Sequence, residues 1–500
     1  MHRPCIRGPS ENAGASRRFR LRARESRDFH ATDAMLAVSK GMTDSRIVPM
    51  KSPLLAAALA FFFAMPLPAA SVAPDPAQAD VALVRATECF VGAYRLPGAT
   101  IDIGPSDGGL RWRHVDGRSG KLVATGDGGW NSLEGWTDRN DGHRIALSGC
   151  GRDAVLQFDG TAASRIALEV RETTFQGDGG TRLAGRLVLP EGDAKVPLVV
   201  LVHGAEQDSA RTWDFMQRQL PAEGVAAFVY DKRGTGDSGG TYTQDYDVLA
   251  NDAVAAMCEA KRMAGVRAVR VGFRGGSQGG WVAPLAATRT HVDFVIVGYG
   301  LAVNALQEDR EATILQMQLK GYPPDIIDSA LEIVDAAGVL AGSDFQRGFE
   351  AFDAVRMKYR DRPWYKDVYG NFTHLLLPYY GDELRRKVQP YRFGTPWHYD
   401  PMTVLRELRT PQLWELGDAD IDAPMGETFH RLRTLARDGA PITIAVFPGG
   451  EHGMTTFETD ADGTRTSLRY AGGYTRMTVD FARGKLGDAY GNARMYAPGQ

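Results

Sequence analysis

A series of short, continuously apolar runs in the C-terminal two thirds of the chain constrains the fold most strongly. The runs are VPLVVLVHG, VAAFVYD, VRVGFRG, FVIVGYG, QLWELGD and ITIAVFPG, and segments of helical length separate most of them. Strands without alternation are buried on both faces, and parallel strands need a long crossover between them. The pattern therefore predicts an α/β fold with a mostly parallel sheet covered by helices. We expect helices at residues 214–223, 248–263, 277–287, 424–437 and 474–484.

One long interval interrupts this alternation. Residues 304–408 contain no apolar run of this kind, and they are rich in aromatic residues, as in RPWYKDVYGNF and LLLPYYGDEL. An insertion of this length needs structure of its own. We predict a helical cap at residues 304–408, over the C-terminal edge of the sheet, with the core divided into residues 171–303 and 409–500. The aromatic residues of the cap serve as substrate pocket or as cap core.

Residues 80–170 have a different pattern, in which short alternating runs are broken by Gly, Asp and Asn at intervals of about ten residues. This spacing predicts an N-terminal antiparallel β domain, either a sheet or a small barrel. Trp112, Trp130 and Trp136 lie in this segment. Aromatic residues of small β domains usually pack in the core, so we interpret the three as core residues rather than a binding face.

The N-terminus carries no sign of a globular domain. Residues 1–49 are rich in Arg, Ser and Ala, which indicates a disordered leader or a misassigned start if translation begins at Met42 or Met50. Residues 50–79 have the layout of a signal peptide, with Lys51 before an apolar core too short to span a membrane. An uncleaved membrane anchor is the alternative. We expect an exported protein, periplasmic or secreted, with no membrane attachment after cleavage.

Export affects the interpretation of the cysteines. Cys89 and Cys150 both lie in the β-rich segment, so an oxidising compartment would permit a bridge between them. The sequence leaves the bridged and the reduced forms as alternatives. Cys258 lies in a helical segment, where we expect a buried thiol.

Composition excludes several classes of function. Lys and Arg together number 58 and Asp and Glu 61, so no basic excess indicates nucleic-acid binding. No CxxC or His-rich spacing indicates a metal site. The segment RGTGDSGG matches the dinucleotide fingerprint formally, but no helix begins at its glycines. We therefore interpret residues 231–240 as a structural loop and expect neither cofactor nor metal.

The segment FRGGSQGGW gives the clearest indication of chemistry. Ser277 lies between an apolar strand and a predicted helix, in a G-x-S-x-G pattern. Gly275 and Gly279 would allow a tight turn that exposes the serine, and the helix directs its N-terminal N–H groups toward it. This context predicts that Ser277 is a nucleophile and that the N–H of Gln278 binds an oxyanion.

A serine nucleophile needs a base, and the base needs a carboxylate. His452 is the histidine that follows the last predicted strand, in a loop that returns to the edge carrying Ser277. The loop GDADIDAP offers three carboxylates, of which we choose the central Asp420. A second oxyanion donor is predicted at the N–H of Ala205, which follows a fully apolar strand.

The segments HGA, DKRGTGDSGG, GGSQGG, GDADIDAP and GGEHG, in this order, resemble the α/β-hydrolase superfamily. The branch that they resemble contains bacterial carboxylesterases related to the prolyl-oligopeptidase and dienelactone-hydrolase groups, some with a β-rich N-terminal domain and a helical cap. The resemblance covers about residues 173–500 and implies the same nucleophile, base and acid. The chain departs from the pattern at Arg274 and Gly276, which flank the elbow, and at residues 455–473, which extend the chain after His452.

These observations predict a serine hydrolase that cleaves a small-molecule carboxylic ester through an acyl-enzyme. A peptidase or acyl-peptide hydrolase with the same triad is the alternative, and it would need a charge to orient a chain terminus. Glu206, Arg274 and Arg310 are candidates, but none lies in a recognisable peptidase motif. A non-catalytic binding protein is the alternative from another class.

Overall fold

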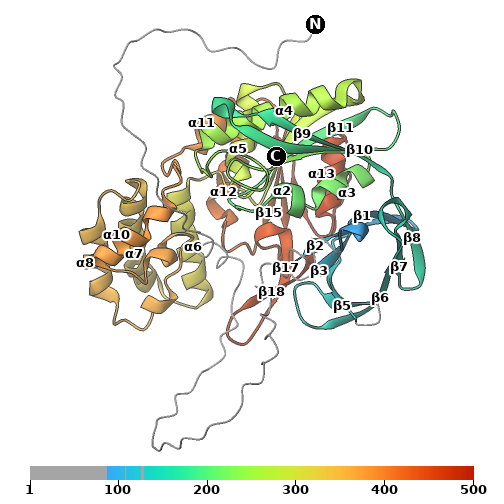
Figure 1. The fold of residues 1–500 in the computed structure, drawn as a ribbon. Coiled ribbons are helices and arrows are strands. Elements are labelled where there is room, and N and C mark those ends of the chain that lie inside the picture. Colours follow the sequence, from blue (N-terminus) through green and yellow to red (C-terminus); the bar gives the residue numbers. More distant parts are fainter. Residues whose placement is uncertain (1–86, 107–108, 126–128, 500) are drawn as a thin grey trace, which may run out of the picture.

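The computed structural model describes residues 87–106, 109–125 and 129–499, so the predicted leader and signal peptide lie outside the described residues. Three parts follow one another in Figure 1: a β-barrel, a sheet with helices, and a group of helices inserted into the latter. Within the described ranges, no helix has the length and apolar character needed to cross a membrane.

The N-terminal part is a closed, eight-stranded barrel in which each strand pairs with the next and β8 pairs with β1. Its antiparallel pairing agrees with the predicted β domain. Trp112 is buried in its interior, and Trp130 packs against the same cluster. Trp136 is 40% exposed, so our placement of it in the core was wrong; its ring lies under the Arg111 guanidinium instead. The strands are β1 (Gly92–Leu96), β2 (Ala99–Ser106), β3 (Gly109–His114), β4 (Ser119–Ala124), β5 (Trp130–Glu134), β6 (Asn140–Ser148), β7 (Val155–Phe158) and β8 (Thr161–Arg165).

The central sheet has nine strands in the order β19-β16-β15-β14-β13-β11-β12-β10-β9. The apolar runs form its parallel strands, from β11 to β16, and β9, β10 and β19 pair antiparallel at the edges. The predicted parallel sheet is therefore confirmed. The strands are β9 (Leu168–Gln176), β10 (Arg182–Pro190), β11 (Val196–Val202), β12 (Ala226–Tyr230), β13 (Ala268–Gly276), β14 (Phe294–Gly298), β15 (Gln412–Gly417), β16 (Ile442–Phe447) and β19 (Arg494–Tyr496).

Helices cover both faces of this sheet, and each face has its own apolar cluster. One cluster joins the sheet to α4 (Tyr246–Ala264), α5 (Gly279–Arg289) and α12 (Met425–Arg437). The other joins it to α3 (Met216–Ala222) and α13 (Tyr474–Ala482). The short α2 (Ala210–Trp213) precedes α3. The expected helix at 277–287 begins two residues late, because the backbone of Ser277 is not helical.

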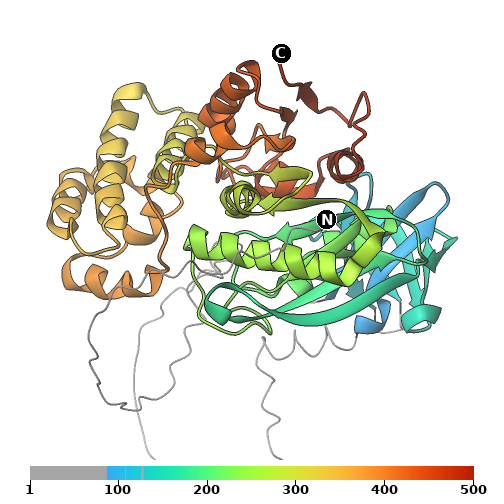
Figure 2. The same cartoon turned by 90° about the horizontal axis from the view of Figure 1, so that it is seen from above.

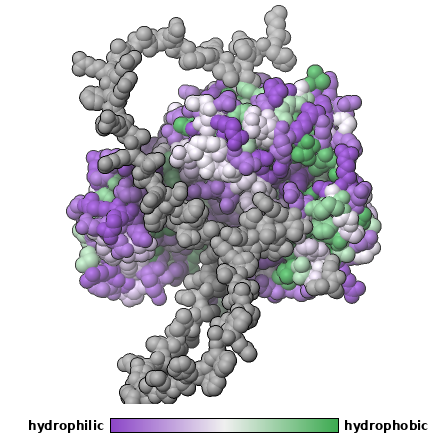
Figure 3. Space-filling model, in the orientation of Figure 1, coloured by the Kyte–Doolittle hydropathy of each residue, from purple (hydrophilic) through white to green (hydrophobic). Residues whose placement is uncertain are grey.

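A helical insertion connects β14 to β15, as predicted for the cap, and it stands beside the sheet in both ribbon views (Figures 1 and 2). Most of its helices pack around an apolar cluster of their own, whereas the last one packs against the core cluster that contains α5. Hydrophilic residues cover most of the visible side of this insertion in Figure 3, so the cluster lies inside it. The helices are α6 (Ala305–Leu319), α7 (Pro324–Gly342), α8 (Phe349–Tyr359), α9 (Thr373–Leu376), α10 (Gly381–Lys387) and α11 (Pro401–Glu407).

The extension after His452 connects the barrel to the core. It forms a hairpin of β17 (Thr455–Thr459) and β18 (Arg465–Tyr470). The Tyr470 N–H donates to the Gly117 carbonyl at 2.8 Å, and the Trp136 N–H donates to the Ser467 carbonyl at 2.9 Å. A buried ion pair between Asp102 of the barrel and Arg218 of α3 fixes the same junction.

Cys89 and Cys150 form a disulfide at a sequence separation of 61, so the bridged alternative is the one the structure contains. We predict that the Cys89→Ala/Cys150→Ala variant loses about 2–4 kcal/mol of unfolding free energy, since a bridge across a long loop restricts the unfolded chain. Denaturant unfolding followed by circular dichroism measures this loss. Reductant should destabilise the parent and leave the variant unchanged; equal midpoints for parent and variant would contradict the prediction.

Candidate active site

The elbow between β13 and α5 holds Ser277 in a conformation with φ +51°, which side-chain-bearing residues rarely adopt. The neighbouring glycines are required by close packing. A Cβ on Gly275 would lie 2.0 Å from the Gly279 carbonyl oxygen, and one on Gly279 would lie 2.2 Å from the Val202 oxygen. The turn therefore raises the serine above the end of β13, where the loops after β15 and β16 also lie.

The structure brings the three predicted triad residues together. His452 Nε2 lies 3.1 Å from Ser277 Oγ, and His452 Nδ1 lies 3.0 Å from Asp420 Oδ2. The other Asp420 oxygen accepts the N–H groups of Asp422 and Ala423 at 3.0 and 2.7 Å, which fixes the buried carboxylate. Asp418 instead pairs with Arg494 at 2.9 Å, so the middle carboxylate of the loop is the one in position.

The charge around His452 favours its protonated form. Burial lowers the pKa of His452, but the carboxylates of Asp420, Asp422 and Glu308 together outweigh burial and raise that pKa. Tyr299 presents its ring at 5.0 Å from the imidazole, in an edge-on arrangement. A histidine that receives the serine proton is therefore stabilised by the surrounding carboxylates.

Ala205 and Gln278, the predicted oxyanion donors, both line the pocket that contains Ser277 and His452. In the described structure neither backbone N–H donates to another group of the chain. Both N–H groups are therefore available to a molecule in this pocket, so the oxyanion-hole assignment stays a prediction.

The pocket above Ser277 opens under the helical insertion and has a cavity volume of about 270 Å³. Eight aromatic residues line it, whereas other aromatic residues of the insertion, such as Phe349 and Phe352, belong to the core of the insertion. Both expected roles of these residues therefore occur. Two carboxyl groups, those of Glu308 and Asp422, also face this pocket. The aromatic lining residues are Tyr246, Trp281, Phe345, Tyr369, Phe372, Tyr391, Phe393 and Trp397.

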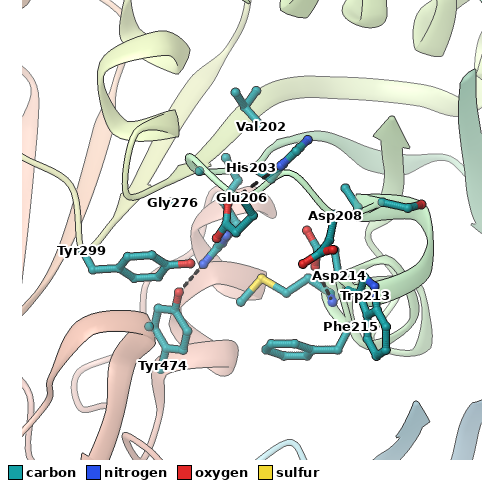
Figure 4. Close-up of a pocket in the computed structure, with 16 residues that line it drawn as sticks. Val202, His203, Glu206, Asp208, Trp213, Asp214, Phe215, Gly276, Tyr299 and Tyr474 are labelled. Carbon is teal, nitrogen blue, oxygen red and sulfur yellow. Dashed lines mark hydrogen bonds and ion pairs between the residues drawn. The ribbon is translucent and has the colours of Figure 1, made fainter. Parts of the chain in front are cut away.

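A second pocket lies on the barrel side of the elbow, next to Gly276 and Gly453 (Figure 4). Glu206 reaches it with an exposed side chain, and Tyr299 and Tyr474 stand opposite. The Arg274 guanidinium is buried there and donates to the Tyr474 hydroxyl. Arg310 lies away from both pockets and pairs with Asp335. Of the three charges considered for a peptide terminus, only Glu206 is exposed within a pocket.

Two residues near the site were missed from the sequence. Lys232 is buried beside the Ala205 loop, although we had interpreted residues 231–240 as structural only. Its position directly after an apolar strand was a signal, because the ends of parallel strands meet at one edge. Glu308 lies on α6, and burial raises its pKa to about 8. No pattern in the sequence distinguishes it from the other acids of that helix.

The carboxyl group of Glu308 provides a test of the electrostatics. Above its own pKa of about 8 Glu308 is ionised, and its negative charge then raises the pKa of His452. Glu308→Gln should therefore lower the pKa of His452 and move the acid limb of reactivity to lower pH. The rate of fluorophosphonate labelling of Ser277 against pH measures the limb. Glu311→Gln, on the same helix but beside Glu427, is the matched control and should leave the limb in place. An unshifted limb in Glu308→Gln would contradict this account.

The chain is similar to known proteins over part of its length. Residues 193–310 match the family described as Hydrolase_4, serine aminopeptidase S33. The chain is 27% identical to esterase FrsA of Enterobacter sp. (strain 638) over 180 residues, which are 35% of this chain and 42% of that protein. FrsA of Salmonella newport matches at the same identity and coverage. The chain thus spans less than half the length of these curated relatives.

Solved structures with similar folds include an esterase from Pyrococcus furiosus, at 15% identity and a TM-score of 0.38, over 57% of this chain and 84% of that one. An esterase from Thermogutta terrifontis matches at 18% identity and a TM-score of 0.32, over 56% of this chain and 91% of that one. The strand order and the elbow are those of an α/β-hydrolase fold, and residues 193–310 of this fold are similar to the matched family.

Proposed function

We propose that this chain is a serine hydrolase that cleaves small carboxylic esters through an acyl-enzyme. The observation that carries the proposal is the continuous hydrogen-bonded series from Asp420 through His452 to Ser277, at the floor of a largely apolar pocket. A serine becomes nucleophilic when an adjacent base accepts its proton and a third group orients that base.

The reaction would proceed in two displacements. Ser277 Oγ attacks the ester carbonyl carbon while its proton passes to His452 Nε2, and the carbonyl oxygen, now negative, receives the N–H groups of Ala205 and Gln278. The intermediate collapses, and His452 donates the proton to the departing alkoxide. Water then attacks the acyl-enzyme with His452 as base, which releases the acid and restores Ser277.

The walls of the pocket favour an acyl or aryl group of modest size. Trp281, Phe372 and Trp397 offer flat apolar surface. A negatively charged group would lose solvation and would meet the carboxyl groups of Glu308 and Asp422 in this pocket.

Amide hydrolysis is the alternative. The description of the matched family names a serine aminopeptidase, and the Glu308 carboxyl in the pocket would pair with a substrate ammonium group. Ester cleavage remains the preferred proposal, because most of the pocket wall is apolar and the curated relatives are named esterases.

Labelling and kinetics test the triad directly. We expect one fluorophosphonate adduct on the parent, measured by intact mass, and none on Ser277→Ala. Asp420→Asn should lower kcat on an aryl ester by about ten-thousandfold, because the base loses its orienting carboxylate. The matched control is Asp418→Asn, in the same loop, which should retain most of the activity. An unlabelled, folded parent would contradict the proposal and favour a non-catalytic binding protein.

Paired substrates decide between the two chemistries. An ester and an amide of the same acyl group should differ strongly in kcat/KM in favour of the ester. If the amide is the better substrate only when it carries a free amino group, and Glu308→Gln abolishes that preference, the aminopeptidase alternative replaces the esterase.

We also propose that the protein is exported after cleavage of residues 50–79. The disulfide between Cys89 and Cys150 supports this proposal, since such bridges persist in oxidising compartments. Cell fractionation followed by N-terminal sequencing should find a mature chain that begins close to Asp80 outside the cytoplasm. A full-length chain in the cytoplasmic fraction would contradict export.

A further inference from the structure

Lys232 is a buried lysine for which the hydrolytic mechanism above gives no role. It is the second residue after β12, it is 3% exposed, and within the described part of the chain it makes no ion pair. Burying an ammonium group is costly unless hydrogen bonds replace the lost water. The contacts that replace it therefore indicate what the residue does.

Both hydrogen bonds of the Lys232 ammonium go to the oxyanion loops. Nζ donates to the Gly204 carbonyl oxygen at 2.6 Å and to the side-chain oxygen of Gln278 at 3.3 Å. Gly204 precedes one predicted oxyanion donor, and Gln278 carries the other. A single cation thus connects the two loops that supply the two N–H groups.

The bond to Gly204 has a geometric consequence. The Gly204 carbonyl and the Ala205 N–H belong to the same peptide unit, and in a planar trans peptide the two groups point in opposite directions. Holding the oxygen toward Lys232 therefore directs the Ala205 N–H away from Lys232. A charged donor on the carbonyl also withdraws electron density from the peptide, which makes its N–H a stronger donor.

We propose that Lys232 is a positioning residue that orients and polarises the Gly204–Ala205 peptide of the oxyanion hole. This inference rests on the proposed hydrolysis through Ser277. Lys232 itself does not touch the substrate; it acts through the N–H of Ala205, and through its contact with Gln278 it keeps the second loop in register.

The surroundings of Lys232 allow it to remain charged. Burial lowers its pKa to about 8, and the Glu206 carboxylate opposes that shift. Its Nζ also lies 4.8 Å from the centre of the Tyr242 ring. At neutral pH the group is therefore mostly an ammonium ion.

Tyr242 provides a matched comparison within the same loop. Its hydroxyl donates to the Ala205 carbonyl at 2.6 Å, which belongs to the next peptide unit and not to the one that carries the Ala205 N–H. Removing that hydroxyl loosens the loop without removing the polarising charge. Substituting Lys232 and substituting Tyr242 therefore distinguish orientation of the donor peptide from general support of the loop.

The experiment compares an aryl ester with its thiono counterpart, in which sulfur replaces the carbonyl oxygen and accepts hydrogen bonds poorly. The parent should prefer the oxygen ester strongly. Lys232→Met should lower kcat on the ester by about tenfold to a hundredfold with little change in KM, below the loss from removing a donor itself. The ester-to-thionoester preference should fall by a similar factor.

If Lys232 had only a structural role, its substitution would lower kcat on both substrates by the same factor and leave the ester-to-thionoester preference unchanged. That result would overturn the inference. Lys232→Gln, which is too short to reach Gly204 but stays polar, serves as a second variant if the methionine variant does not fold. Lys232→Arg keeps a charged donor and should retain more of the preference than either. Tyr242→Phe should keep most of the ester-to-thionoester preference. If that preference fell as much in Tyr242→Phe as in Lys232→Met, the assignment to the Gly204–Ala205 peptide would be contradicted.

Labelling keeps this test independent of the substrate. The phosphoryl oxygen of a fluorophosphonate occupies the same hole, so Lys232→Met should be labelled at Ser277 more slowly than the parent by a similar factor. A parent that is labelled but hydrolyses no ester would contradict the proposed substrate class alone. Equal labelling rates of parent and variant would overturn the role of Lys232, whichever substrate the enzyme uses.

Discussion

The strained backbone of Ser277 is the constraint on which the rest of the site depends. A side-chain-bearing residue at positive φ costs about 1–3 kcal/mol and persists only where its surroundings enforce it. Here the backbone packs so closely around the turn that neither Gly275 nor Gly279 has room for a Cβ. The sheet provides the enforcement: β13 lies between β11 and β14, so the turn cannot relax without disturbing three central strands.

That central position also explains why the other groups converge on the serine. The base follows β16, its carboxylate follows β15, and the Ala205 loop follows β11. Parallel strands place all these ends at one edge, so residues far apart in sequence meet without special contacts of their own. The buried Lys232 follows β12 at the same edge, which is why it reaches both the Gly204 carbonyl and Gln278.

Much of this could be predicted from the sequence, because the signals were local. Unbroken apolar runs specified the parallel strands, and glycines flanking one serine specified the elbow. Asp420 could be chosen because the loop is short and its centre faces the histidine. Glu308 could not be found, since its importance comes from how the helical insertion docks over the core. Lys232 was not identified because its segment was compared only with the dinucleotide-binding fingerprint. Trp136 lies outside the barrel core because it packs against the hairpin that follows His452. The strand pattern of the barrel does not reveal this contact on its outer surface.

The two additions to the core have separate physical roles. The insertion after β14 buries its own apolar cluster and supplies aromatic walls above Ser277. The barrel is fixed through the β17–β18 hairpin and the Asp102–Arg218 ion pair, on the side where the second pocket lies. The elbow that carries Ser277 thus stands between the aromatic pocket under the insertion and the second pocket on the barrel side.

The most direct test of the central claim is a crystal structure of the protein with a phosphonate bonded to Ser277. The account predicts that the phosphoryl oxygen lies within hydrogen-bonding distance of the N–H groups of both Ala205 and Gln278. His452 should remain hydrogen-bonded to Asp420. An adduct whose oxygen points to solvent, or to donors other than these two, would contradict it.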